Sequence, residues 1–187
     1  MPRKSFASMH CSIARTFAAL GDAWSALILR DVFVGLRRFE DLKEDLGISR
    51  KVLSERLDHL VASGILERRP YQERPLRTEL ILTRQGEELI PPILALLAWG
   101  DRYPSAASGP PALIVHKGHL ARARVSCEVC GETLHARDLV VRAGPGGKWG
   151  PGTKKIAELF RAQAEAPPTP RRSPRRRPSR RPAPRPS

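Results

Sequence analysis

The sequence predicts a mainly α-helical fold with a small β-hairpin, followed by a small β-rich module and a disordered tail. Three observations support this prediction. Apolar residues recur at helical spacing through the first hundred residues, two short strand-like stretches occur within that part, and the composition changes sharply after Tyr103. The 187 residues are enough for one domain with a real core plus appendages.

The first part of the chain divides into short helices that end at glycines. Apolar spacing predicts an amphipathic helix over residues 12–20. Residues 24–34 are apolar nearly all round, which predicts a buried helix, and a shorter helix follows over residues 39–46. Gly21 and Gly35 stand where the first two helices should end, because glycine is common just past a helix C-terminus.

A fourth helix is predicted over residues 50–63. Ser49 before it is a good N-cap residue, and Gly64 after it lies where a terminating glycine belongs. Residues 65–69 and 78–83 are predicted to be two strands joined by a charged link that contains proline.

A final helix is predicted from Thr83, which can serve as its N-cap, to about Arg102. Pro91 and Pro92 fall inside this pattern. Because proline lacks the amide proton that a helix interior requires, we expect a kink or break near Glu88.

The fourth helix is amphipathic. Leu53, Leu57 and Leu60 share one side of a helical wheel, whereas Lys51 and Glu55 lie on the other. The preceding short helix and its glycine-bearing turn complete a helix-turn-helix, in which the second helix enters the major groove of DNA. With the basic hairpin that follows, the pattern predicts a winged helix-turn-helix. An ordinary surface helix with a polar outer face is the alternative.

We predict that DNA is contacted by the outer side of this helix and by the basic hairpin. Residues at the helix start suit phosphates and base edges, and the amides there attract phosphate. The hairpin resembles the wing of a winged helix, which lies along the DNA backbone or minor groove. The predicted DNA-contacting residues are Arg38, Ser49, Arg50, Lys51, Ser54, Glu55, Arg68, Arg74 and Arg77.

Residues 11–103 resemble the HxlR-type winged helix-turn-helix transcriptional regulators of bacteria and archaea. The likeness lies in the stretches "CSIARTFAALGDAWSALILRDVFVGLRRFEDL", "GISRKVLSERLDHLVASGILERR", "RPLRTELILTRQGEEL" and "LLAWG". The resemblance implies a dimeric regulator, expected to be a repressor, that binds a palindromic or repeated double-stranded DNA operator. It also implies a homodimer interface built from the first and last helices, and an inducer that the sequence does not identify.

The final helix independently favours a dimer. This helix carries more apolar side chains than so small a domain can bury. An unburied apolar surface of that size usually marks an interface. Packing within the core is the alternative for part of the set. The apolar residues are Leu89, Ile90, Ile93, Leu94, Leu96, Leu97 and Trp99.

Cys11 is a candidate redox sensor. It precedes the first helix, where amide dipoles can raise the reactivity of a thiol. Some members of the resembled family use a Cys at this place to sense oxidants or electrophiles. The family usually has Pro after this Cys, whereas this chain has Ser12. The alternative is a small buried residue at the dimer interface.

The motif "CEVCG" has the form of a zinc knuckle through Cys127 and Cys130. Upstream, "HKGH" offers His116 and His119, so the four residues are candidate ligands for a Cys₂His₂ zinc site. Longer chains of the resembled family often carry a Cys in the upstream half that is missing here. A small β-hairpin module without metal is the alternative.

The predicted organisation is a DNA-binding and dimerisation domain followed by a linker, the β-rich module, a short helix and a disordered tail. The tail has eight Arg, eight Pro and no acid, so it cannot bury a core. The net charge is +14, and removing the eight tail arginines leaves 14 − 8 = +6 on the rest. In chain order, these parts are residues 1–104, 105–112, 113–150, 151–166 and 167–187.

The charge favours a polyanion partner, and the sequence contains no recognisable catalytic frame. We therefore expect a cytoplasmic, nucleoid-associated transcriptional regulator that is not an enzyme and has no membrane partner. The alternatives are a general nucleic-acid packaging protein, or a thiol redox protein that uses Cys11 or the C-x-x-C pair.

Overall fold

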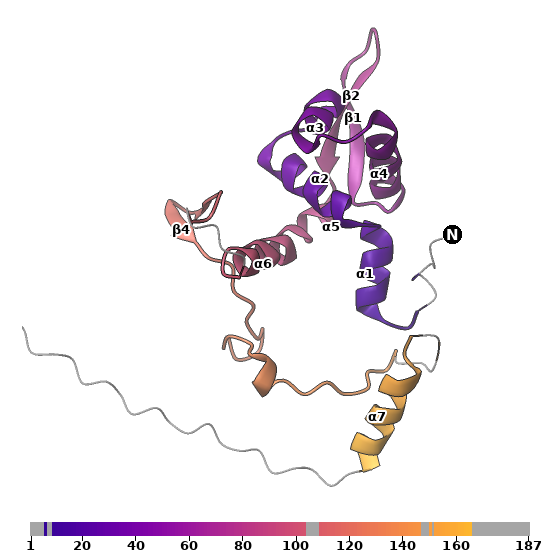
Figure 1. Cartoon of the computed structure of the whole chain (residues 1–187), viewed down its shortest axis with the longest axis vertical. Coiled ribbons are helices and arrows are strands. Elements are labelled where there is room, and N and C mark those ends of the chain that lie inside the picture. Colours follow the sequence, from indigo (N-terminus) through magenta and orange to yellow (C-terminus); the bar gives the residue numbers. More distant parts are fainter. Residues whose placement is uncertain (1–5, 7–8, 104–108, 147–149, 151, 166–187) are drawn as a thin grey trace, which may run out of the picture.

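The structure is a computed structural model of the 187-residue chain. Figure 1 shows a helical body with a β-hairpin that projects from it, followed by a smaller C-terminal part. The predicted tail lies outside the described residues, as do residues 105–108 of the predicted linker. The structure describes residues 6, 9–103, 109–146, 150 and 152–165.

Four helices begin the fold, and their bounds agree closely with the sequence prediction. The glycines end the helices as expected, with a φ of 90° at Gly21. Gly35, at 118°, donates its N–H to carbonyls of the preceding helix. The helices are α1 (Ser12–Leu20), α2 (Ala23–Val34), α3 (Phe39–Leu46) and α4 (Arg50–Ala62).

The predicted hairpin is present as β1 (Leu66–Gln72) and β2 (Arg77–Leu82), which pair antiparallel. It is longer than predicted, because the link expected to start at Pro70 continues as strand to Gln72. Pro70 faces Thr78 in the register. A two-stranded sheet consists of edge strands, which tolerate proline where no ladder N–H is needed.

The hydrophobic core lies where α2, α3 and α4 meet the hairpin. The β1–β2 hairpin packs against α2 and α4, so the two strands and the helices close around one cluster. Burying such side chains stabilises the fold by about 1.5–3 kcal/mol each. The core residues are Ile28, Leu29, Val32, Leu42, Ile48, Leu53, Leu57, Leu60, Ile65, Leu66 and Leu80.

The final helix is broken, as predicted. Thr83 caps the short α5 (Arg84–Glu87): its Oγ1 accepts from the Gly86 amide at 3.1 Å. After Glu88, α6 (Ile90–Gly100) begins with Pro91 and Pro92 in its first turn. Prolines are tolerated there because the first turn of a helix has no partners for its amides.

The C-terminal part contains two small hairpins and a helix. The first hairpin pairs β3 (Ile114–His116) with β4 (His119–Ala121). The second is marked by an isolated bridge between Ser126 and Thr133. A 3₁₀ turn, η1 (Ala136–Asp138), follows, and α7 (Lys154–Glu165) comes last.

No helix within the described part of the chain has the length and apolar character needed to cross a membrane.

Candidate DNA-binding surface

The start of α4 is organised by Ser49. The Ser49 Oγ accepts a hydrogen bond from the Val52 amide at 3.3 Å, which confirms its predicted role as N-cap. Leu53 and Leu57 are fully buried and hold the helix against the core. An ion pair of 2.6 Å between Arg56 and Asp22 adds a further attachment. The helix therefore presents a fixed outer face.

Lys51 and Glu55 lie exposed on that outer face. Ser54 is half-buried, and its Oγ donates to Oδ2 of Asp58 at 3.5 Å. Within the described residues, no ion pair or hydrogen bond engages the ammonium group of Lys51. Lys51 is therefore a cation at the start of the second helix of the motif that is free to contact DNA.

Arg50 is exposed but already has partners. Its guanidinium forms an ion pair with Glu40 of α3. The same group lies 4.9 Å from the ring centroid of Phe39, which is a cation–π distance. These contacts join the start of α4 to the start of α3, and they orient Arg50 at the turn of the motif.

Arg68 joins the wing to α4. Its Nη2 donates to Oδ1 of Asp58 at 2.7 Å, so β1 is tied to the outer side of α4. The neighbouring Arg69 instead pairs with Glu79 across the hairpin at 2.6 Å. Both arginines lie on β1, in the strand that the sequence predicted. They differ in their partners, because Arg68 pairs with α4 and Arg69 pairs with β2.

Arg38 joins the start of α3 to the wing. Its guanidinium carbon lies 4.9 Å from the ring centroid of Tyr71 on β1. The three segments predicted to contact DNA, at the starts of α3 and α4 and along the wing, are thus linked to one another by the arginine contacts. Figure 1 shows the hairpin projecting between α3 and α4.

Arg74 and Arg77 lie at the tip of the wing, and both side chains are exposed. Neither guanidinium has an ion-pair partner in the part of the chain that the structure describes. Exposed arginines at a projecting hairpin suit contact with phosphates, which is the position that the sequence predicted for them.

Sequence reasoning missed the acidic and aromatic partners of these arginines. Glu40, Asp58 and Tyr71 each hold one predicted DNA-contacting arginine. The Nε2 of His59 lies 3.1 Å from the carbonyl oxygen of Ala18. That contact packs α4 against α1. The periodicity of a single helix could not predict it, because the two residues lie far apart in the sequence.

Cys11 is the N-cap residue of α1 and is half-buried. It makes no side-chain capping hydrogen bond. The helix that it precedes is amphipathic, yet none of its residues is buried. Ile13 is 68% exposed and Phe17 is 59% exposed, so α1 presents an open apolar face beside the thiol.

The candidate zinc ligands lie on the two small C-terminal hairpins. His116 and His119 face each other across the β3–β4 turn. Amide groups of Cys130 and Val129 that face the Cys127 thiol lower the pKa of that thiol. Among the described residues, no three His, Cys, Asp or Glu side chains gather as one ligand set, so the two pairs do not meet in this structure.

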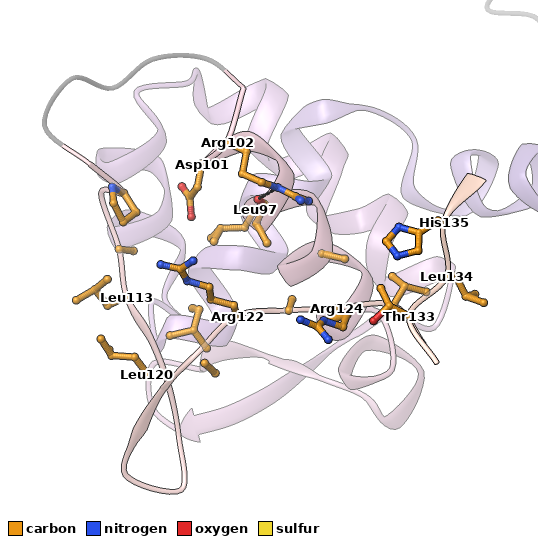
Figure 2. A pocket seen from close by; sticks show the side chains of 18 of the residues that line it. Leu97, Asp101, Arg102, Leu113, Leu120, Arg122, Arg124, Thr133, Leu134 and His135 are labelled. Atoms are coloured by element: carbon orange, nitrogen blue, oxygen red, sulfur yellow. Dashed lines mark hydrogen bonds between the residues drawn. The ribbon is translucent and has the colours of Figure 1, made fainter. Parts of the chain in front are cut away.

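A groove of about 920 Å³ separates α6 from the small hairpins. Figure 2 shows Leu97 of α6 and Asp101, which follows that helix, on one side, with Leu113, Leu120 and Arg122 across from them. This groove is remote from the start of α4 and from the wing, so it is not part of the candidate DNA-binding surface.

Comparison with known proteins agrees with the fold. Residues 19–108 match the HxlR-like helix-turn-helix family. The chain is 42% identical over 139 residues to the uncharacterized HTH-type transcriptional regulator Rv3095 of Mycobacterium tuberculosis, covering 73% of this chain and 88% of that one. It is 34% identical over 88 residues to the HTH-type transcriptional regulator YodB of Bacillus subtilis, covering 46% and 79%.

Two solved structures described as transcription factors share the fold. PA1607 aligns with a TM-score of 0.67 at 33% identity, covering 75% of this chain and 100% of that one. PA1374 from Pseudomonas aeruginosa aligns with a TM-score of 0.52 at 33% identity, covering 80% and 99%.

The helix-turn-helix of α3 and α4, with the basic wing beside it, defines a winged helix-turn-helix transcriptional regulator. Within that class, the chain belongs to the HxlR-like helix-turn-helix family, as its sequence motifs predicted.

Proposed function

We propose that this protein is a homodimeric repressor that binds a specific double-stranded DNA operator through α4 and the wing. The observation that carries the proposal is the arrangement of cations. Lys51 stands free at the start of α4, while Arg74 and Arg77 stand free at the wing tip. In helix-turn-helix proteins the start of the second helix meets base edges, and flanking cations neutralise phosphates.

The apolar surface supports the proposed dimer. On α1, Ile13 and Phe17 are exposed, and on α6, Leu96 is 67% exposed and Trp99 is 56% exposed. Exposed large apolar side chains on the first and last helices of the domain suit a two-fold interface. A dimer would present two copies of α4 to successive turns of the major groove, about 34 Å apart.

Repression is the proposed outcome because a dimer seated on DNA beside a promoter blocks access to it. The proposed role is binding, without a catalytic step. Its working location is the cytoplasm, at the nucleoid, where operator DNA lies. An inducer would act by changing the spacing of the two α4 helices.

The decisive experiment compares Lys51→Ala with the native protein on operator and random duplexes. Upstream DNA from the protein's own locus, narrowed by footprinting, supplies the operator. A lost base contact costs about 1–3 kcal/mol, so operator affinity should fall roughly 5- to 150-fold while random-duplex affinity changes far less. Arg84→Ala is the matched control, because Arg84 is an exposed cation on α5, which follows β2 at the base of the hairpin, opposite the wing tip.

Full operator preference in Lys51→Ala would show that Lys51 does not read bases. Equal native affinity for operator and random DNA would instead favour the alternative, a general nucleic-acid packaging protein. A thiol redox protein would show neither preference nor salt-dependent duplex binding. A reporter gene behind the operator tests the sign of regulation, since a repressor lowers its transcription.

The dimer has its own test. Light scattering of the native protein should give twice the chain mass of 20.8 kDa. Leu96→Glu should shift the mass toward one chain, because it places a charge within the proposed interface. Val34→Glu is the control, since Val34 is 75% exposed at the end of α2. A native monomer that keeps full operator affinity contradicts the two-fold arrangement.

A further inference from the structure

The two C-terminal hairpins share a feature that DNA binding does not use: each holds a pair of metal-ligating side chains across a tight turn. In the first, His116 and His119 are register partners at the ends of β3 and β4. The residues between them, Lys117 and Gly118, have φ of 48° and 82°. Two successive positive φ values mark the tight type I′ turn, which holds the flanking residues together.

The histidine rings are already at a spacing that suits one ion. The centroids of His116 and His119 lie 5.6 Å apart with an interplanar angle of 83°. Two imidazoles bound to one tetrahedral zinc, each at about 2.0–2.1 Å, hold their centroids roughly 5 Å apart. A cation between the rings therefore requires little rearrangement of this hairpin.

The second hairpin has the backbone geometry of a knuckle. The Gly131 amide donates to the Cys127 carbonyl at 2.8 Å, and the Cys127 amide donates to the Glu132 carbonyl at 2.8 Å. Gly131 takes a φ of 71°, and backbone amides of Val129 and Cys130 face the Cys127 sulfur. This tight turn brackets the two cysteines in the way that a zinc knuckle does.

Both pairs are accessible. Cys130, His116 and His119 are exposed, and Cys127 is half-buried. Nothing in the described core depends on these side chains, so their presence is not explained by packing. Arg137 forms an ion pair with Asp138 nearby, but no described acid forms an ion pair with either histidine.

We propose that the two pairs are preformed halves of one Zn²⁺ site, in which His116, His119, Cys127 and Cys130 of the same chain bind the ion tetrahedrally. Two thiolates and two imidazoles are a donor set that zinc favours. Among the described residues the two pairs do not gather into one ligand set, so a shared ion requires the two hairpins to come together. This inference goes beyond the proposed function and does not depend on it.

The chain between the halves allows that approach. Seven residues, 120–126, separate His119 from Cys127. Residues 120–121 pair within β4 and residues 125–126 pair with 133–134, so the unpaired link is 122–124, which spans up to roughly 10 Å at about 3.3–3.6 Å per residue. Residues 122–125 belong to no helix or strand and run beside the groove, as Figure 2 shows near Arg122 and Arg124. Rearranging this segment breaks no pairing within β3–β4, and it leaves the helical core unchanged.

The test titrates Co²⁺ and then Zn²⁺ into full-length, reduced, chelator-treated protein. We expect one Co²⁺ per chain, with a sulfur-to-cobalt charge-transfer band and the intense visible bands of a tetrahedral ion, and Zn²⁺ should displace it. Cys127→Ser and Cys130→Ser should lose the charge-transfer band. His116→Asn and His119→Asn should each weaken binding more than about 100-fold, since even residues that merely support a ligand are worth 10–100-fold.

Two matched variants should bind Co²⁺ like the native protein. His135→Asn changes a histidine that follows the second hairpin, and Cys11→Ser changes a cysteine at the start of α1. Zn²⁺ should also shift the imidazole resonances of His116 and His119 but not that of His135. A far-UV circular-dichroism spectrum like that of the native protein would show that each variant is folded.

Three outcomes overturn the proposal. One ion per two chains with full affinity in the histidine variants would mean that two chains share a site made of cysteines. Loss of binding in His135→Asn would mean that the ligand set is different. Absence of Co²⁺ binding by the reduced native chain would mean that the two pairs are not a metal site.

Discussion

Arg68 on β1 donates to Asp58 on α4 at 2.7 Å, which attaches the wing to the helix that is proposed to enter the major groove. The pair lies at the surface, with the Arg68 side chain 37% exposed and that of Asp58 65% exposed. Pairs of this kind contribute at most about 1 kcal/mol to stability. Its importance is therefore geometric, because it fixes how the wing is aimed relative to α4.

Asp58→Asn should reduce sequence discrimination without unfolding the protein. Removing a negative charge beside the DNA raises the affinity for random duplex. The wing, no longer attached to α4, then adds less to the affinity for the operator. We expect the ratio of operator to random affinity to fall several-fold, measured by fluorescence anisotropy at constant salt. Glu79→Gln is the matched control, because Glu79 pairs with Arg69 within the hairpin and does not reach α4. An unchanged ratio in Asp58→Asn contradicts a positioning role.

The wing tip should contribute affinity that does not depend on sequence. Arg74→Ala and Arg77→Ala each remove an exposed cation, so each should weaken operator and random binding by similar factors. If each arginine neutralises one phosphate, the slope of log affinity against log salt becomes shallower by about 0.9 per substitution. Titrations at several salt concentrations measure this slope. A loss confined to the operator would instead place the wing tip against base edges.

The element boundaries were predictable because they depend on local chemistry. Ser49 caps α4 and Gly21 and Gly35 end their helices, since capping and left-handed backbone are properties of single residues. The broken final helix followed from Pro91 and Pro92 for the same reason. Capping and helix-ending preferences act over one or two helical turns, so they can be predicted from the local sequence alone.

Partners distant in the chain were not predictable. Arg50 and Arg68 were expected to face DNA freely, but Glu40 and Asp58, each ten residues away, engage them. The contact between His59 and Ala18 spans 41 residues. A periodic pattern tells which side of an element is polar, but it does not tell which element packs beside it.

Asp31 makes stability depend on pH. Burial raises the pKa of its carboxyl above its usual value near 3.8, although Arg30 beside it acts in the opposite direction. Its Oδ2 is buried without a hydrogen-bond partner among the described residues. Because the folded state holds the proton more tightly than the unfolded state, ionised Asp31 destabilises the fold at neutral pH. That cost is relieved as the pH falls through the folded pKa toward 3.8.

Asp31→Asn should therefore raise Tm at pH 7, and the gain should shrink as the pH is lowered toward 4. A gain of about 1 kcal/mol corresponds to about 4–8 °C for a domain of this size. Calorimetry across this pH range measures it. Asp101→Asn is the control, because Asp101 is an exposed carboxyl just after α6 and does not take part in the Asp31 shift. A Tm that falls at pH 7 would show that the carboxylate of Asp31 stabilises the fold.

Cys11 stands beside the exposed apolar face of α1, so modifying it should alter the proposed dimer. Mild peroxide or a quinone should lower operator affinity in the native protein and leave Cys11→Ser unaffected. Non-reducing electrophoresis would show whether the oxidised form is a disulfide between two chains. Cys130→Ser is the matched control, because Cys130 is exposed on the second C-terminal hairpin. Equal responses in native protein and Cys11→Ser would make Cys11 a packing residue.

The Arg- and Pro-rich tail, residues 167–187, lies outside the described residues, so its prediction rests on charge. Its eight arginines can neutralise phosphates and release counterions but cannot read bases. Deleting the tail should lower affinity for operator and random DNA by similar factors and make the salt slope shallower, while operator preference remains with α4. A chain in which the eight arginines are replaced by glutamine separates charge from length. An unchanged salt slope in both variants would mean that the tail does not contact DNA, and that an RNA or protein partner explains its composition better.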